Sequence, residues 1–231
     1  MYNKLFASFY DIIFSGKSYD AEVDFIINEI NNPLAKILDV GCGTGSHSIR
    51  LHDRGYQVKG IDPSAEMISI AKQKNVDIFD NLSIHNISDQ YDACISMFHV
   101  INHIMSETEL QLFFNKCQLL VDDGIFIFDC FNSDAVLKDP PYECTSKKFT
   151  NFELRNNAEF DYTNLKLTMI SSIYDGSELV QLYTLEHIIW LRSKIVELLN
   201  NAGFNNIKCY KVGSTDSPTD DDYKVIYICK K

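Results

Sequence analysis

In the stretch ILDVGCGTG at 37–45, three glycines on alternate positions directly follow an apolar run. A chain uses glycine where the backbone turns sharply or where another group must approach it closely. A strand that enters such a turn and continues as a helix forms a crevice for a nucleotide or an anion. A phosphate-binding P-loop would need a lysine after the glycines, and a dinucleotide motif would need glycine where this chain has Ser46. The pattern therefore indicates either another kind of ligand-binding turn or a tight turn without a ligand.

Acidic side chains follow the same pattern of apolar runs. Asp62 ends the next run, in GYQVKGIDPS, and lies 21 positions after Gly41. At about this spacing, a carboxylate at the tip of the second strand accepts hydrogen bonds from ribose hydroxyls. Asp39 precedes the glycines, and Asp80 follows a third apolar run at 76–79. Together these carboxylates and the glycine turn indicate a site for a ligand that contains a nucleoside.

The combination of LDVGCGTG with GIDPS resembles the class I S-adenosylmethionine (SAM)-dependent methyltransferases, over roughly 37–130. The resemblance implies SAM as the cofactor and S-adenosylhomocysteine as its product. A side chain at Gly43 would then collide with the amino-acid end of the cofactor. The cofactor-binding residues that the resemblance implies are Tyr19, Asp39, Gly41, Cys42, Gly43, Asp62, Pro63, Met67, Asp80 and Met97.

Within this set, each carboxylate has an implied partner on the cofactor. Asp39 would lie near the methionine amino group, Asp62 would bind the ribose, and Asp80 would accept from the adenine N6. Met67 would pack beneath the adenine, and Met97 and Phe98 would line the methyl-donor end. A solvated loop carboxylate is the alternative interpretation for Asp80, and simple core packing is the alternative for Met97 and Phe98.

Two further stretches concern the methyl acceptor: FYDIIFSGKSYDAE at 9–22 and SMFHVINHI at 96–104. Both resemble segments of the N-methyltransferases that act on nucleotide-linked 3-amino-deoxyhexoses. The resemblance implies that His103 accepts a proton from the amine or holds its lone pair in line with the methyl group. Tyr10 or Tyr19 would orient the amine or shield the sulfonium, or else would anchor the N-terminal segment. His99 and His103 are spaced for a shared helix face, but no third ligand lies nearby, so no metal is predicted.

The leading hypothesis is therefore a SAM-dependent methyltransferase whose acceptor is the amine of a small molecule: an amino sugar, a sugar nucleotide or a phosphorylated small amine. The alternatives are an O-methyltransferase acting on a sugar or other hydroxyl, and a SAM-binding protein without catalysis. The net charge of −11, from 21 Lys and Arg against 32 Asp and Glu, argues against a nucleic-acid acceptor, which needs a basic surface.

The candidate site residues must be positioned by strands and helices, which the sequence predicts as alternating apolar runs and helical patterns. Buried strands are predicted at 36–40, 57–61, 92–98 and 124–130. Helices are predicted between and around them, at 19–31, 46–54, 65–74 and 106–121. This alternation is typical of a parallel sheet with helices on both faces. The stretch FNSDAVLKDPPYECTSKK at 131–148 contains two adjacent prolines and predicts a loop.

The C-terminal part has a different pattern. Alternating residues at 149–190 predict an inserted antiparallel β layer, followed by a helix at 192–202 and strands at 207–212 and 223–229. We therefore expect one α/β domain over 1–231. Its core would be a doubly wound, mostly parallel seven-stranded sheet, Rossmann-like, with the β layer added and with an N-terminal lid and helix at 1–32.

No run of 18 apolar residues occurs, so neither a membrane-spanning helix nor a membrane partner is predicted. The seven cysteines occur singly, without a C-x-x-C pair and without a recognisable signal peptide. These features favour a reducing, cytoplasmic location. The β layer could either form a homodimer contact or close the active site of a monomer.

Overall fold

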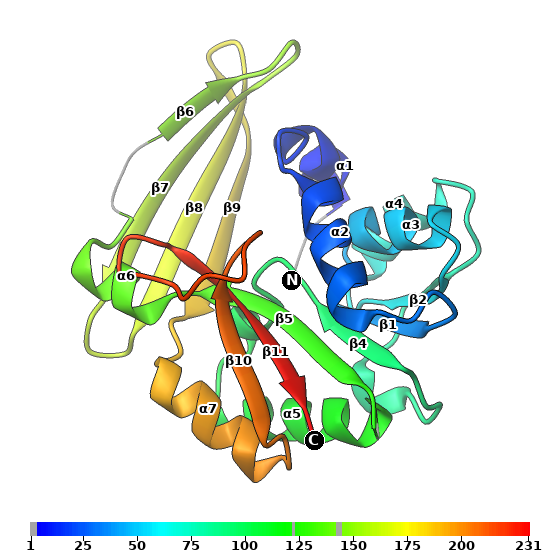
Figure 1. The fold of residues 1–231 in the computed structure, drawn as a ribbon. Coiled ribbons are helices and arrows are strands. Elements are labelled where there is room, and N and C mark those ends of the chain that lie inside the picture. Colours follow the sequence, from blue (N-terminus) through cyan, green and yellow to red (C-terminus); the bar gives the residue numbers. More distant parts are fainter. Residues whose placement is uncertain (1–3, 122, 142–144) are drawn as a thin grey trace.

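The computed structural model describes residues 4–121, 123–141 and 145–231, and its main layer is a seven-stranded sheet (Figure 1). The strand order is β10-β11-β5-β4-β1-β2-β3. All neighbours are parallel except β11, which runs antiparallel to both β5 and β10. The strands are β1 (Lys36–Val40), β2 (Gln57–Ile61), β3 (Phe79–Asp80), β4 (Ala93–Ser96), β5 (Ile125–Phe131), β10 (Asn206–Lys211) and β11 (Lys224–Lys230). The predicted fold class is confirmed.

Helices cover both faces of this sheet because successive side chains of a strand point to opposite faces. Phe126 and Phe128 of β5 join the core beneath α5 and α7, whereas Ile125 and Ile127 join the core beneath α2 and α3. The helices are α2 (Tyr19–Ile30), α3 (Ser46–Asp53), α4 (Ala65–Lys72), α5 (Glu107–Val121) and α7 (Arg192–Asn201), with single 3-10 turns η1 (Ile84–Asn86) and η2 (Val100–His103). None of the helices in the described ranges is long and apolar enough to cross a bilayer.

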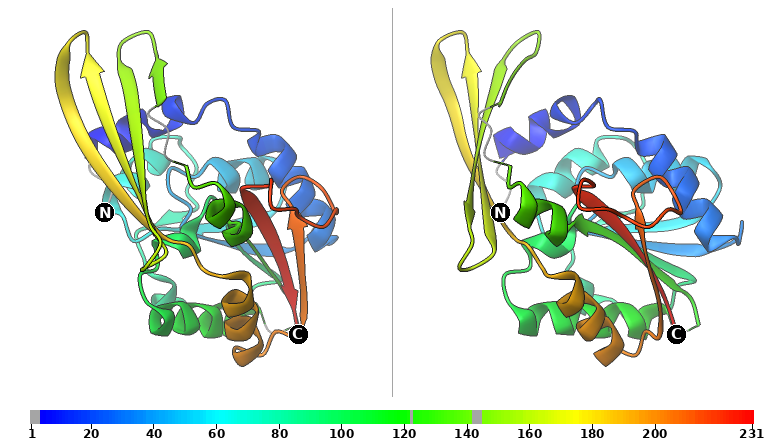
Figure 2. Two further views of the ribbon diagram at one scale, coloured as in Figure 1. Left: turned by 90° about the vertical axis from the view of Figure 1, so that its left-hand side faces the viewer. Right: turned by 60° about the vertical axis from the view of Figure 1, so that its left-hand side comes forward.

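A second, antiparallel sheet stands above the carboxyl ends of the parallel strands (Figures 1 and 2). Its strand order is β6-β7-β8-β9. The strands are β6 (Thr145–Lys148), β7 (Glu153–Asp161), β8 (Lys166–Asp175) and β9 (Glu178–Ile188). Helix α1 (Lys4–Ile13) packs on this layer: Phe6 stacks on Tyr183 with ring centroids 4.2 Å apart. Helix α1 and the second sheet together form one apolar cluster.

The loop predicted at 131–148 was wrong in part. It contains the short helix α6 (Ser133–Lys138) and strand β6, while 142–144 lie outside the described residues. Asn132 caps α6 by accepting a hydrogen bond from the backbone N–H of Asp134, and Val136 is buried in an apolar cluster. A six-residue helix is too short to show a period, and β6 is exposed along its whole length, so it shows no alternation.

Candidate active site

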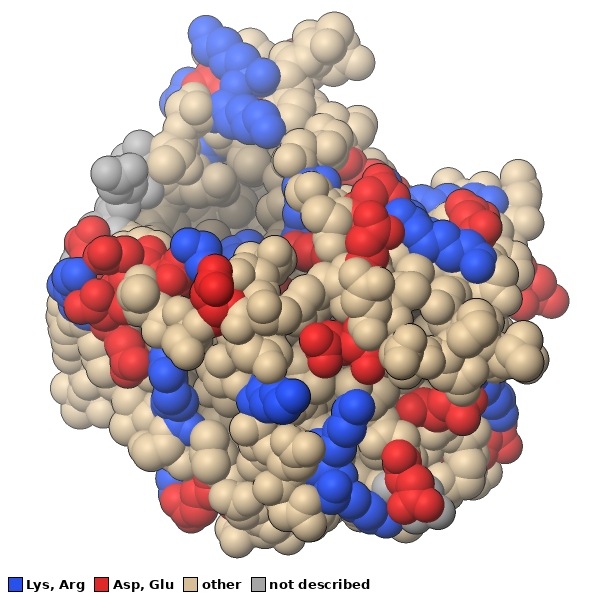
Figure 3. Space-filling model, in the orientation of Figure 1, with Lys and Arg blue, Asp and Glu red and all other residues tan. Residues whose placement is uncertain are grey.

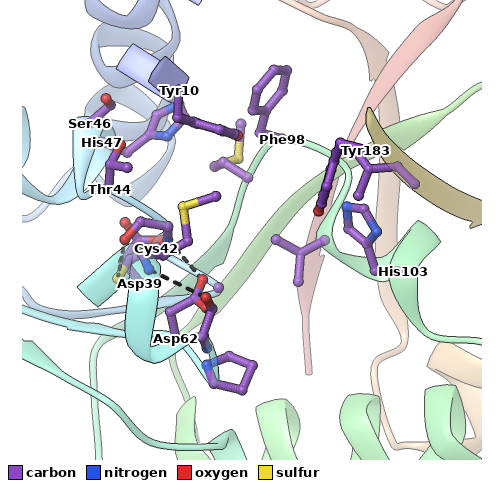
Figure 4. A pocket seen from close by; sticks show the side chains of 18 of the residues that line it. Tyr10, Asp39, Cys42, Thr44, Ser46, His47, Asp62, Phe98, His103 and Tyr183 are labelled. Atoms are coloured by element: carbon purple, nitrogen blue, oxygen red, sulfur yellow. Dashed lines mark hydrogen bonds between the residues drawn. The ribbon is translucent and has the colours of Figure 1, made fainter. Parts of the chain in front are cut away.

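A cavity of about 470 Å³ opens at the carboxyl ends of the parallel strands (Figure 4). Its floor is formed by the turns after β1, β2 and β4, and its other walls come from α1 and β9. A second cavity of about 370 Å³ adjoins it and shares Gly41, Pro63, Val100 and His103. Most predicted site residues line the first cavity: Tyr10, Tyr19, Asp39, Gly41, Cys42, Gly43, Asp62, Pro63, Met67, Met97 and His103.

The three glycines after β1 all have positive φ, but they meet different surroundings. A Cβ on Gly41 would lie 2.7 Å from the Val100 side chain, and one on Gly45 would lie 2.3 Å from the Phe79 ring. These two glycines therefore allow neighbouring side chains to pack. A Cβ on Gly43 would meet no atom of the described chain within 4 Å. Gly43 therefore leaves open space at the cavity wall, where the amino-acid end of SAM would fit.

Asp62 links the glycine turn to helix α4. Its Oδ2 accepts from the Gly43 N–H at 2.9 Å, and its Oδ1 accepts from the Ser64 N–H at 2.8 Å. Burial raises the pKa of this carboxyl, and the two backbone hydrogen bonds oppose that effect. Asp39 is more deeply buried: burial raises its pKa, and the Ser48 hydroxyl donates to it at 2.6 Å. Both carboxylates are thus held in fixed orientations beside the cavity.

Replacing Asp62 by alanine is expected to weaken S-adenosylhomocysteine binding by roughly 5- to 150-fold, corresponding to 1–3 kcal/mol for lost hydrogen bonds to a charged group. The substitution also removes the acceptor that fixes the Gly43 N–H, so some stability will be lost. Isothermal titration calorimetry measures the affinity, with the exposed Asp53→Ala variant as the control. Equal affinities in the two variants would contradict the assignment.

The N-terminal helix is tied to the glycine turn by a polar network. Asp11 of α1 accepts from the Thr44 hydroxyl at 2.6 Å and forms an ion pair with Lys74 at 2.7 Å. Lys74 also donates to the backbone carbonyl of Thr44 at 2.7 Å. Further along the chain, Glu22 pairs with Lys17 and lies 2.8 Å from the His47 ring nitrogen. These contacts hold the first helices over the cofactor end of the cavity.

The opposite end of the cavity begins where β4 stops, earlier than the predicted boundary at residue 98. Phe98 and His99 have φ values of +71° and +64°, a conformation that bulky residues adopt only when their surroundings hold them there. Asp129 accepts from the His99 N–H at 2.8 Å, and the His99 ring stacks on Phe131 at 4.2 Å. The turn brings the Phe98 side chain to the cavity and leads into η2, which carries His103.

His103 faces β9 across this end of the cavity (Figure 4). Its ring donates a hydrogen bond to the backbone carbonyl of Glu186, and burial lowers its pKa to about 4. The His187 ring lies 4.4 Å away, and burial lowers the pKa of His187 to about 3. Both imidazoles are therefore neutral at pH 7. One ring nitrogen of His103 is thus fixed as a donor to the backbone. The other ring nitrogen can accept a hydrogen bond from a ligand at this end of the cavity.

Asp80 does not line the first cavity. It ends β3, and its carboxylate pairs with Lys59 at 3.0 Å. Its proposed contact with adenine stays a prediction. Within the described part of the chain, no three His, Cys, Asp or Glu side chains are grouped to hold a metal ion.

Several lining residues were missed by the sequence analysis: Thr44, Ser46, His47, Ser64, Val100, Met105, and the β9 segment at 183–186. Ser46 and His47 directly follow the glycine turn at the start of α3, so their position alone was a usable signal. The β9 residues reach the cavity only because the second sheet stands over the first. No local pattern reports that contact.

Comparison with known proteins agrees with this geometry. The model of the methyltransferase domain family matches residues 14–208. A SAM-dependent methyltransferase from Clostridium acetobutylicum ATCC 824 has the same fold, with a TM-score of 0.82 and 21% identity over 97% of each chain. The glycine/sarcosine N-methyltransferase of Aphanothece halophytica is 28% identical, over 91% of this chain and 82% of that protein. The dTDP-3-amino-3,6-dideoxy-alpha-D-glucopyranose N,N-dimethyltransferase of Streptomyces fradiae is 27% identical, over 55% of this chain and 54% of that protein. The chain therefore belongs to the methyltransferase domain family and is a SAM-dependent methyltransferase.

Proposed function

We propose that this methyltransferase acts on the amine nitrogen of a small molecule: an amino sugar, a sugar nucleotide or a phosphorylated small amine. When bound, SAM supplies an electrophilic methyl group on a sulfonium. The observation that carries the proposal is the neutral imidazole of His103, whose pKa burial lowers to about 4. It lies at the end of the cavity away from Asp39 and Asp62 (Figure 4).

Hydroxyl and amine acceptors differ in whether they must lose a proton before they can attack the methyl group. A hydroxyl becomes a good nucleophile only as it loses its proton, which requires a base whose pKa suits that task. An imidazole with a pKa of about 4 is too weak a base for an alcohol. A neutral amine already has a lone pair, and it needs only to be held in line with the methyl group. The site therefore favours an amine over a hydroxyl.

The chain's own groups would then act by orientation. The acceptor nitrogen of His103 receives a hydrogen bond from an amine N–H, which turns the amine lone pair toward the methyl group. Tyr10, Phe98 and Tyr183 line the same end with aromatic rings. Such rings attract the positive charge on the sulfonium and, after transfer, on the ammonium product. They also exclude water from the reacting atoms.

The relatives support the same choice. Two relatives whose names state an acceptor are N-methyltransferases, one for glycine and sarcosine and one for a dTDP-linked amino sugar. The decisive test is a screen of the purified protein with methyl-labelled SAM, using amines and their hydroxyl analogues in pairs. NMR analysis of the product locates the label. A methyl group found on oxygen, with the amine analogue unreacted, would leave the O-methyltransferase alternative in its place.

We also propose that the N-terminal segment, of which 4–32 are described, acts as a lid. Asp11→Asn removes the ion pair of α1 to Lys74 and replaces the charged acceptor of the Thr44 hydroxyl by a neutral, weaker one. Amide hydrogen exchange in α1 should be faster in this variant, while the free energy of unfolding changes by less than about 1 kcal/mol, as for other surface ion pairs. In the wild type, S-adenosylhomocysteine should slow exchange in α1.

The matched control is Asp20→Asn, which removes ion pairs to Arg50 and Arg54 outside the cavity. Exchange in α1 should match the wild type in this control. If α1 is equally protected in the wild type with and without S-adenosylhomocysteine, the lid proposal is wrong.

A further inference from the structure

Two lysines flank the aromatic ring that closes the acceptor end of the cavity. The Nζ atom of Lys17 lies 5.1 Å from the centroid of the Phe98 ring, and that of Lys224 lies 5.2 Å from the same centroid. Burial is the main cause that lowers the pKa of Lys224, and the nearby Lys17 ammonium lowers it further. Two ammonium groups therefore lie close to one ring on a protein whose net charge is −11.

The two lysines differ in their partners. Lys17 forms an ion pair with Glu22. Within 4–121, 123–141 and 145–231, Lys224 has neither an ion pair nor a side-chain hydrogen bond. Burial lowers its pKa, and the nearby Asp129 opposes that effect. Asp129 is itself engaged, because it accepts from the His99 N–H. A half-buried ammonium without a direct partner gains from any anion that can reach it.

The topology explains why Lys224 reaches this place. It is the first residue of β11, the antiparallel strand, and it pairs in register with Phe131 at the end of β5. The beginning of β11 therefore lies beside the carboxyl end of β5 (Figure 1). The Phe98 ring, which follows the neighbouring strand β4, is within reach of Lys224 from there. The surface beneath the second sheet is hollowed on this side, and Lys or Arg side chains lie at the margin of the hollow (Figure 3).

We propose that the acceptor amine carries an anionic group, a phosphate or a carboxylate, and that Lys224 binds this group with Lys17 beside it. The inference rests on the proposed function and narrows its acceptors. Phe98 lies between the lysines and the cavity that holds the reacting amine, so the body of the acceptor would pass along this ring. The anionic group would then accept hydrogen bonds from the Lys224 ammonium, with the Lys17 ammonium as a second positive charge near the same ring.

The cofactor also carries a carboxylate, so the experiment must distinguish binding of the acceptor's anionic group from binding of the cofactor. The probe is inorganic phosphate, titrated at constant ionic strength into protein saturated with S-adenosylhomocysteine, with thermal unfolding as the readout. Phosphate should raise the melting temperature of the wild type in a saturable way. Lys224→Met should weaken phosphate binding by about 10-fold or more and leave the affinity for S-adenosylhomocysteine unchanged.

Two further variants control for folding and for general charge. Lys224→Arg keeps the charge and should retain most of the phosphate affinity. Lys230→Met removes an exposed lysine from the other end of the same strand and should behave as the wild type does. Equal phosphate affinity in the wild type and Lys224→Met would overturn the inference. So would a loss of S-adenosylhomocysteine affinity in Lys224→Met with phosphate binding intact, because the lysine would then serve the cofactor.

Kinetics with paired acceptors distinguishes phosphate from carboxylate. The pairs are phosphoethanolamine with ethanolamine, glucosamine 6-phosphate with glucosamine, and glycine with glycinamide. The anionic member of at least one pair should be preferred in kcat/KM, and Lys224→Met should abolish that preference. Turnover of the neutral members alone, unchanged in Lys224→Met, would overturn the inference and leave the proposed amine methylation standing. Failure of the wild type to bind S-adenosylhomocysteine would overturn the proposed function itself.

Discussion

Replacing Gly43 by alanine is expected to lower the affinity for S-adenosylhomocysteine by about 100-fold or more, a loss of about 3 kcal/mol. The added Cβ would project into space that no described atom of the chain occupies within 4 Å. That space is where the amino-acid end of the cofactor would approach the backbone. The methyl group would therefore collide with the ligand and not with the protein. Calorimetry with S-adenosylhomocysteine measures the change.

Backbone strain needs its own control, because Gly43 has a φ of +56°. An alanine with this conformation costs roughly 1–2 kcal/mol of stability wherever it occurs. Gly176, in the turn between β8 and β9, has a φ of +59° and is equally open around its Cβ position. Gly176→Ala should therefore show a similar loss of stability without the loss of affinity. If both variants bind the ligand as the wild type does, the glycine turn is not the cofactor site.

Replacing His103 by asparagine is expected to lower kcat by about 10- to 100-fold, as for the loss of a group that orients a reactant. Affinity for S-adenosylhomocysteine should change little. The folded-state pKa of about 4 lies below the usual value of 6.5, so His103 gains a proton only when the pH falls to about 4. Between pH 6 and pH 9 it stays neutral, and the ratio of wild-type to variant kcat should therefore be constant.

The exposed His52→Asn variant is the control, and it should keep full activity. A wild-type inflection near pH 6–7 that disappears in His103→Asn would show that His103 acts as a base. A fully active His103→Asn enzyme would remove the residue from the mechanism altogether.

The cofactor half of the site was predictable because its residues follow local rules. Gly41, Gly43 and Asp62 come directly after strands β1 and β2, and the carboxyl ends of adjacent parallel strands meet at one edge of the sheet. The local sequence pattern of each strand and of the turn after it is therefore enough to predict that these residues lie close together. Even so, the reason for each glycine was not predictable. Gly41 and Gly45 make room for Val100 and Phe79, which lie far away in the sequence.

The acceptor half depends on contacts between distant segments. His103 was identified through family resemblance, but its low pKa follows from burial against β9, whose place above the sheet has no local signal. Lys224 lies more than 120 residues after Phe98 in the chain, and only the reversed direction of β11 brings them together. The short helix α6 escaped notice because a capping asparagine and one buried valine stabilise it, not a repeated pattern.

The packing of α1 on the second sheet has a consequence for how the enzyme's two ligands affect each other. Tyr10 of α1 and Tyr183 of β9 face the same cavity, and Phe6 stacks on Tyr183, so the N-terminal helix and the second sheet form one roof over the cavity. A cofactor that orders α1 also orders β9, the wall that the acceptor meets. Each ligand should then raise the affinity for the other by the same factor, as thermodynamic linkage requires.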